Sequence, residues 1–176
     1  MAQASFETEW SRINIWLHWL IVLLIIVQYI DSESMVSLWD ATQQGTQTAQ
    51  FTKYVGWGHI AAGSTILVAA FIRLVDRFWT GRPVHPQGVP SWATWLAKIT
   101  HFLIYAILFV MPSLGLLAWF TGNDTYAQYH TFFWTPLLVL VAVHIIGALA
   151  QHFVFKTNVL TRMLTFKKRY RRRGRC

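Results

Sequence analysis

The segment Ile13–Ile30 reads INIWLHWLIVLLIIVQYI and contains 18 uncharged residues between Arg12 and Asp31. An α-helix needs about 20 mainly apolar residues to cross the hydrocarbon core of a bilayer. Further uncharged stretches of 19, 25 and 31 residues follow, and the last is too short for two crossings. The sequence therefore predicts four transmembrane helices, at about residues 13–31, 54–77, 94–120 and 131–155.

Composition supports an integral membrane protein rather than a soluble one. Of the 176 residues, 55% are hydrophobic and only 12% are charged, which is too few to cover a soluble domain of this size. Ten tryptophans suit the two membrane–water interfaces. We expect an all-α four-helix bundle that forms one domain over residues 1–176, with a basic tail at 156–176.

Basic residues predict the orientation of the bundle. If the N-terminus is cytoplasmic, 14 of the 15 Lys and Arg residues fall on the cytoplasmic side, as the positive-inside rule requires. The external loops then keep Lys53 and carry Asp31, Glu33, Asp40 and Asp124. The net charge of +8 thus indicates contact with lipid headgroups and not with nucleic acid. The first external loop, 31–50, is expected to be long and polar.

Histidines are unusually frequent in and near the predicted helices, where ionisable side chains are rare and usually functional. Six are in or at the ends of the spans: His18, His59, His101, His130, His144 and His152. A helix–helix hydrogen bond explains one such residue, but nothing structural requires so many. Few carboxylates and a single cysteine, Cys176, disfavour a zinc site or a carboxylate proton relay. The remaining interpretation is that imidazoles from different helices form pairs, which is how a helical bundle holds haem.

The spacing of these histidines predicts two haem sites at different depths. His130 and His144 are 14 residues apart, so on one helix they lie about 40° from a common face and about 21 Å apart along the axis. His59 lies near the outer side and matches His130. His18 and His101 both lie near the inner side, and spacing alone does not choose which of them faces His144.

Several segments, taken in order, resemble the prokaryotic cytochrome b561 family over most of the chain. Its members are small four-helix proteins of the bacterial inner membrane that bind two haems b, and they include the cytochrome subunits of nickel hydrogenases. The resemblance rests on Arg12–Trp19, Gly58–Gly63 with Arg73-Leu74, His101–Tyr105 with Pro112 and Gly115, the pair His130 and His144, and Gln151–Phe153 with Leu160–Met163.

The resemblance implies which residues bind the two irons. It pairs His18 with His144 and His59 with His130. His101 would then lie beside the inner haem as a propionate or quinone contact, with a plain helix contact as the equal alternative. Arg12 and Arg73 lie at the inner ends of their helices, where haem propionates emerge, although headgroup anchoring also suits them. His85 and His152 receive no role.

The family resemblance also implies electron transfer between a periplasmic donor and the quinone pool. Some members are superoxide oxidases that pass an electron from superoxide to ubiquinone. Those members carry a long external loop before the fourth helix, whereas only about ten residues, 121–130, stand there in this chain. The alternative is a haem-bearing membrane-anchor subunit of a periplasmic dehydrogenase, hydrogenase or cytochrome c partner.

Overall fold

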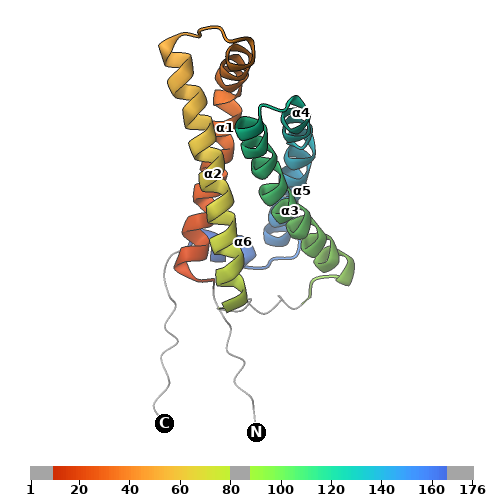
Figure 1. Cartoon of the computed structure of the whole chain (residues 1–176). Helices are drawn as coiled ribbons and strands as arrows, with labels where there is room; N and C mark the ends of the chain where they lie inside the picture. The colour runs from red at the N-terminus through yellow and green to blue at the C-terminus, as the bar shows by residue number, and fades with distance from the viewer. Residues whose placement is uncertain (1–9, 80–87, 166–176) are drawn as a thin grey trace, which may run out of the picture.

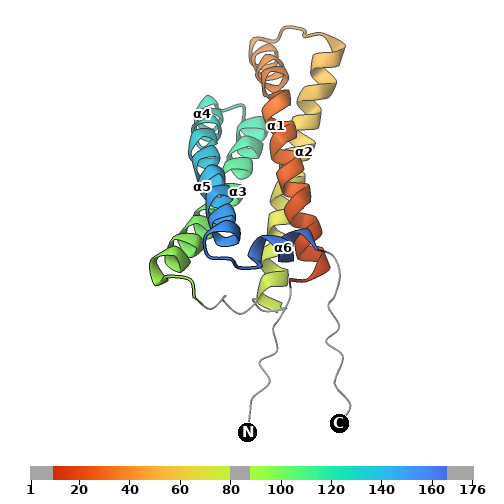
Figure 2. The same cartoon turned by 180° about the vertical axis from the view of Figure 1, so that it is seen from behind.

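The computed structural model describes residues 10–79 and 88–165, and it confirms an all-helical membrane bundle (Figure 1). The bounds are α1 Arg12–Gln44, α2 Gln50–Trp79, α3 Ser91–Thr121, α4 Asp124–Phe132, α5 Trp134–Phe153 and α6 Val159–Leu164. Four segments in the described ranges are long and apolar enough to span a membrane, with α4 and α5 together forming the fourth. Seen from behind, α6 crosses the end of the bundle where α1 begins (Figure 2).

The first external loop is much shorter than predicted, because α1 continues as a helix to Gln44. Charged residues mark where a helix leaves the hydrocarbon, but they do not end it. The helix ends at Gly45, whose φ of 65° is the left-handed conformation that suits a helix C-cap. Leu38 holds the extension against α2, where a Cβ on Gly56 would lie 2.6 Å from its Cδ2 atom. The loop is thereby reduced to 45–49.

The predicted fourth helix is two helices, α4 and α5, with a break at Phe133. Pro136 explains the break, because proline has no N–H to donate to the carbonyl of Phe132 and its ring clashes with that carbonyl. His130 and His144 consequently lie on either side of this break, within one span of 30 residues, Asp124–Phe153. Pro112, by contrast, lies inside α3, which continues to Thr121.

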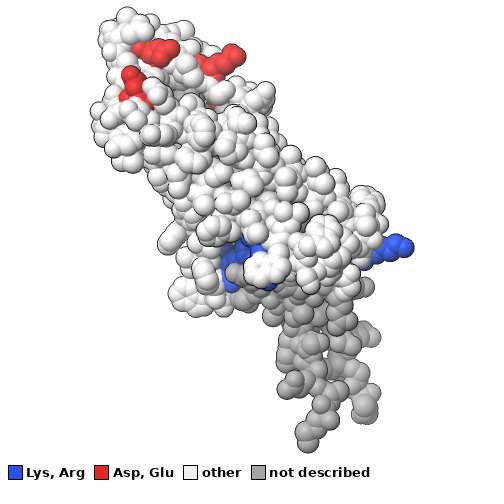
Figure 3. Space-filling view, turned by 90° about the vertical axis from the view of Figure 1, so that its right-hand side faces the viewer, with Lys and Arg blue, Asp and Glu red and all other residues white. Residues whose placement is uncertain are grey.

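The apolar core lies midway along the bundle. Its buried members come from all four spans: Ile21, Ile66, Ala69, Ala70, Ile107, Leu108 and Leu137. Many large apolar side chains face outward instead, Ile30 at 74% and Ile146 at 66% exposure among them, as expected for a surface in contact with lipid. Acidic residues gather at one end of the described surface and basic residues at the other (Figure 3).

Candidate functional site

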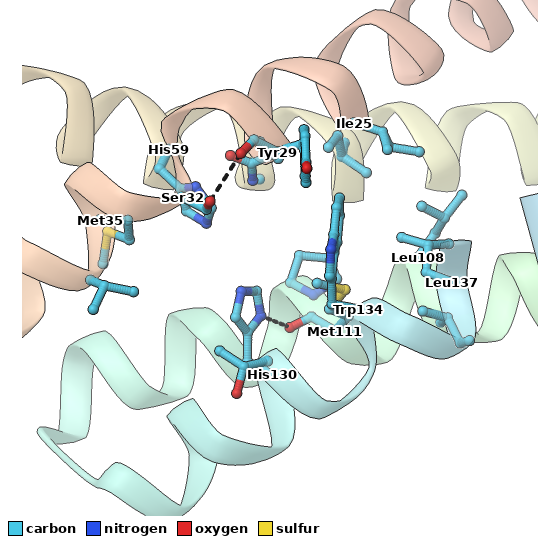
Figure 4. Close-up of a pocket in the computed structure, with 17 residues that line it drawn as sticks. Ile25, Tyr29, Ser32, Met35, His59, Leu108, Met111, His130, Trp134 and Leu137 are labelled. Carbon is cyan, nitrogen blue, oxygen red and sulfur yellow. Dashed lines mark hydrogen bonds between the residues drawn. The ribbon is translucent and has the colours of Figure 1, made fainter. Parts of the chain in front are cut away.

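Two histidines from opposite sides of the bundle approach each other near its acidic end. His59 on α2 and His130 on α4 point into the same space (Figure 4), with ring centres 6.2 Å apart and ring planes at 77°. A metal ion bound between two imidazoles, about 2 Å from each nitrogen, sets their ring centres about 6 Å apart. His59 and His130, called the outer pair below, therefore have the separation of two imidazoles that could hold one metal ion between them.

Hydrogen bonds orient both rings of the outer pair. The Nδ1–H of His130 donates to the backbone oxygen of Met111 at 2.8 Å, and Nδ1 of His59 lies 2.7 Å from the Asp31 carboxylate. A backbone oxygen only accepts, so the proton of His130 is on Nδ1, and the same holds for His59 beside a carboxylate. Each ring thus keeps its Nε2 lone pair for a metal, as metal-binding histidines usually do.

A cavity of about 240 Å³ opens between these two rings, many times the space that one water molecule needs. Its wall is mainly apolar, including Ile25, Ile66, Met111 and Leu137, which suits a flat hydrophobic macrocycle. Tyr29 and Trp134 stack on one another at its side, with ring centres 5.9 Å apart and planes only 9° from parallel.

Two glycines bring the helices close around this cavity. A Cβ on Gly115 would lie 2.9 Å from Nδ1 and 3.1 Å from Cε1 of His130, so only glycine lets this ring reach the backbone of α3. A Cβ on Gly63 would lie 2.9 Å from Nε2 of Gln28, at the wall of the same cavity. The sequence shows that both residues are glycine, but it does not show which contacts require a residue without a side chain.

A second pair lies on the other side of the apolar core. The ring centres of His18 on α1 and His144 on α5 are 6.1 Å apart, with planes at 64°. On α1, His18 precedes Asp31 by 13 residues, which places the two pairs about 20 Å apart along the bundle. His101 on α3 also reaches this inner pair, but its ring centre is only 4.8 Å from that of His144. That separation is shorter than the roughly 6 Å expected of two imidazoles on opposite sides of one metal ion.

A polar network surrounds the inner pair. Asn14 is 1% exposed, and its side chain accepts from Nε of Arg73 at 3.1 Å and donates to Asp76 at 3.0 Å. Ser11 caps α1 through the backbone N–H of Asn14 and also donates to Asp76 at 2.6 Å. The Arg73 guanidinium lies 5.9 Å from the Tyr105 ring centre. This network fixes a cation at the inner end of the bundle.

The remaining predicted residues lie farther from these pairs or outside the described ranges. Arg12 is exposed at the first residue of α1. His152 packs edge-on against Phe153 near the end of α5, with ring centres 4.8 Å apart. His85 and most of the basic tail, from residue 166 onward, are not among the described residues.

Asp31 is the functional residue that the sequence pattern assigned wrongly. It was expected in an external loop, yet it lies inside α1, is 7% exposed and contacts His59. Its position directly after an uncharged run marked it as the end of a span. The residues that follow Asp31 include serine, methionine and leucine, which can continue a helix. These residues argue against a helix that ends at Asp31.

Comparisons with known proteins find a matching family model and several relatives. Residues 9–166 match the family model of prokaryotic cytochrome b561. Cytochrome b562 of Cereibacter sphaeroides is 30% identical over 158 residues, covering 90% of this chain and 96% of that protein. The probable superoxide oxidase CybB of Yersinia pestis is 25% identical over 182 residues, covering 91% and 98%. Cytochrome b561 homolog 1 of Escherichia coli is also 25% identical, over 181 residues, covering 91% and 99%.

Proposed function

Because the chain belongs to the prokaryotic cytochrome b561 family, we propose that it transfers electrons across the bacterial inner membrane by means of two haems b. The observation that carries this proposal is the presence of two histidine pairs at different depths, with ring centres 6.2 and 6.1 Å apart. Four spans with largely apolar surfaces fit a multi-pass protein of that membrane.

The residues present fit haem at both positions. His59 and His130 would hold the outer group and His18 and His144 the inner one, each through Nε2. Haem b supplies reversible one-electron exchange, and each group would be held by two imidazoles. The protein's contribution is to hold the rings, exclude water from the apolar cavity and fix the nearby charges. Arg73, held by Asn14, would pair with a propionate of the inner group.

The charge distribution supports an outward-facing donor site at the α1–α2 end. Glu33, Asp40 and Asp124 are exposed there, whereas the basic residues lie mainly at the other end (Figure 3). The positive-inside rule supports a cytoplasmic location for the basic end, where α1 begins. Electrons would then pass from a periplasmic donor to a quinone such as ubiquinone. Superoxide is one candidate donor, because a similar protein is a probable superoxide oxidase.

One observation favours a second role, as the haem-bearing membrane anchor of a periplasmic redox protein. The hairpin of α1 and α2 extends beyond the turn between α3 and α4 (Figure 1) and presents acidic side chains. Trp39 and Gln43 tie this extension to that turn through Asp124 at 3.1 Å and the Gly122 carbonyl at 2.8 Å. A negative surface repels superoxide and attracts a cationic partner such as a cytochrome c.

Reconstitution of the protein into vesicles distinguishes superoxide-driven reduction of quinone from the role of a membrane anchor. The purified protein is placed in vesicles that contain ubiquinone, and superoxide is generated outside. For the first role we expect ubiquinol to form and superoxide dismutase to abolish its formation. For the second role we expect a quinol to reduce the haem while superoxide yields no ubiquinol. If neither superoxide nor a quinol changes the haem absorption, the proposed function is wrong.

Replacing Gly115 with alanine should weaken the outer haem site selectively. The new Cβ would meet the His130 ring at 2.9 Å and break its bond to Met111. Overpacking of this kind costs about 1–3 kcal/mol, so we expect outer haem binding to weaken by about tenfold or more. Titration of the apoprotein with haem measures this change. Gly147→Ala is the control, since no atom lies within 4 Å of its Cβ position, and equal affinities in the two variants would contradict the packing argument.

A further inference from the structure

Asp31 is a buried carboxylate in a helix that crosses the membrane. Its side chain is 8% exposed and that of His59 is 14% exposed, and the two lie 2.7 Å apart. Burial of a carboxylate is costly unless it is paired and hydrogen-bonded. Acidic residues inside membrane segments therefore usually serve a function, and here the partner is one of the four imidazoles assigned to haem.

We infer that Asp31 lowers the reduction potential of the outer haem and so makes the outer haem the stronger reductant of the two. This inference rests on the proposed function, because it assumes that His59 ligates iron. Asp31 is a positioning residue, since it acts through the His59 ring and does not contact the haem iron.

The physical basis is the charge that each haem site contains. A carboxylate that accepts from Nδ1–H makes the ring a stronger donor to iron and places a negative charge nearby. Both effects stabilise ferric iron over ferrous iron and lower the potential. The opposite ligand, His130, donates to an uncharged backbone oxygen and adds no such charge. Within the outer pair, the charge thus comes from Asp31.

The inner pair has the opposite charge environment. The Arg73 guanidinium is held by Asn14, which lies one helical turn before His18 on α1, and Arg77 lies one turn after Arg73 on α2. One carboxylate, Asp76, accompanies them and accepts hydrogen bonds from Ser11 and Asn14. Among these side chains the two arginines outnumber the one carboxylate. Haem propionates would be present at both sites, so this excess of positive side-chain charge stabilises ferrous iron at the inner site relative to the outer one. The two sites together make electron transfer from the outer to the inner haem favourable.

A purely structural role predicts a different result, because the bond between Asp31 and His59 also joins α1 to α2. Asp31→Asn keeps an oxygen acceptor of nearly the same shape and removes only the charge. Asp31→Glu keeps the charge. Glu33→Gln is the matched control, since Glu33 is an exposed acidic residue two positions further along the same helix. A structural role would change haem content or stability and would leave the potential unchanged.

The test is a redox titration of the purified holoproteins, with haem content measured in parallel. In Asp31→Asn we expect one midpoint potential to rise by an amount equal to about a tenfold change in the reduction equilibrium, or about 59 mV for one electron, and the other to stay constant. In Asp31→Glu and Glu33→Gln we expect both midpoints near those of the unmodified protein. Two haems with unchanged midpoints in Asp31→Asn would overturn the inference and leave the proposed function intact.

A second measurement does not depend on any Asp31 variant. His130→Ala should keep only the inner haem, and that haem should titrate at the higher of the two midpoints of the unmodified protein. If it titrates at the lower midpoint, the inference is wrong. Absence of haem from the unmodified protein would instead refute the proposed function.

Discussion

Replacing His130 with alanine is expected to remove one of two haems and to leave the other in place. His130 supplies one of two rings with centres 6.2 Å apart, and loss of either ring would leave the outer group with one protein ligand. We expect His59→Ala to give the same product, with about half of the unmodified haem content. The measurement is the haem content per chain, determined from the pyridine haemochromogen spectrum.

The double variant tests whether the two residues act on one site. Because both rings serve the same haem, His59→Ala with His130→Ala should retain the same single haem as either variant alone. His152→Ala is the control, because His152 lies near the end of α5 against Phe153 and should leave both haems bound. A double variant that lost both haems would show that these histidines belong to different sites.

Replacing His18 with alanine should remove the inner haem, whereas replacing His101 should not. The His18 and His144 rings are 6.1 Å apart, which allows iron between them, whereas the His101 and His144 rings are 4.8 Å apart. We expect one haem in His18→Ala and two in His101→Ala, the latter with a shifted inner spectrum at most. The reverse result would mean that the inner pairing is wrong.

The four spans could be predicted because bilayer thickness translates directly into a length of uncharged sequence. The same logic could not place the end of α1, since a helix that leaves the hydrocarbon continues in water while its backbone bonds are satisfied. The helix ends at Gly45, but nothing in the sequence distinguishes this glycine from the others. The break at Phe133 follows from Pro136, whose effect on the preceding carbonyl can be recognised from the sequence.

From sequence alone, the positions of the histidines along their helices predict that His59 and His130 lie at the same depth. These positions do not decide whether His18 or His101 is the partner of His144. Depth is one-dimensional, so it cannot separate two residues on different helices at the same level. The distances between ring centres in the structure separate the two residues. Asp31 and Gly115 lay beyond the sequence pattern for a related reason, because their roles depend on one contact each with a histidine from another helix.

The central claim is that this chain holds two haems b, each between two histidines. The most direct measurement is the haem content of the purified, unmodified protein, combined with its reduced-minus-oxidised spectrum. We predict two haems per chain with the α-band of six-coordinate b-type haem. A protein that holds one haem per chain, or none, after haem has been supplied in excess would contradict the account.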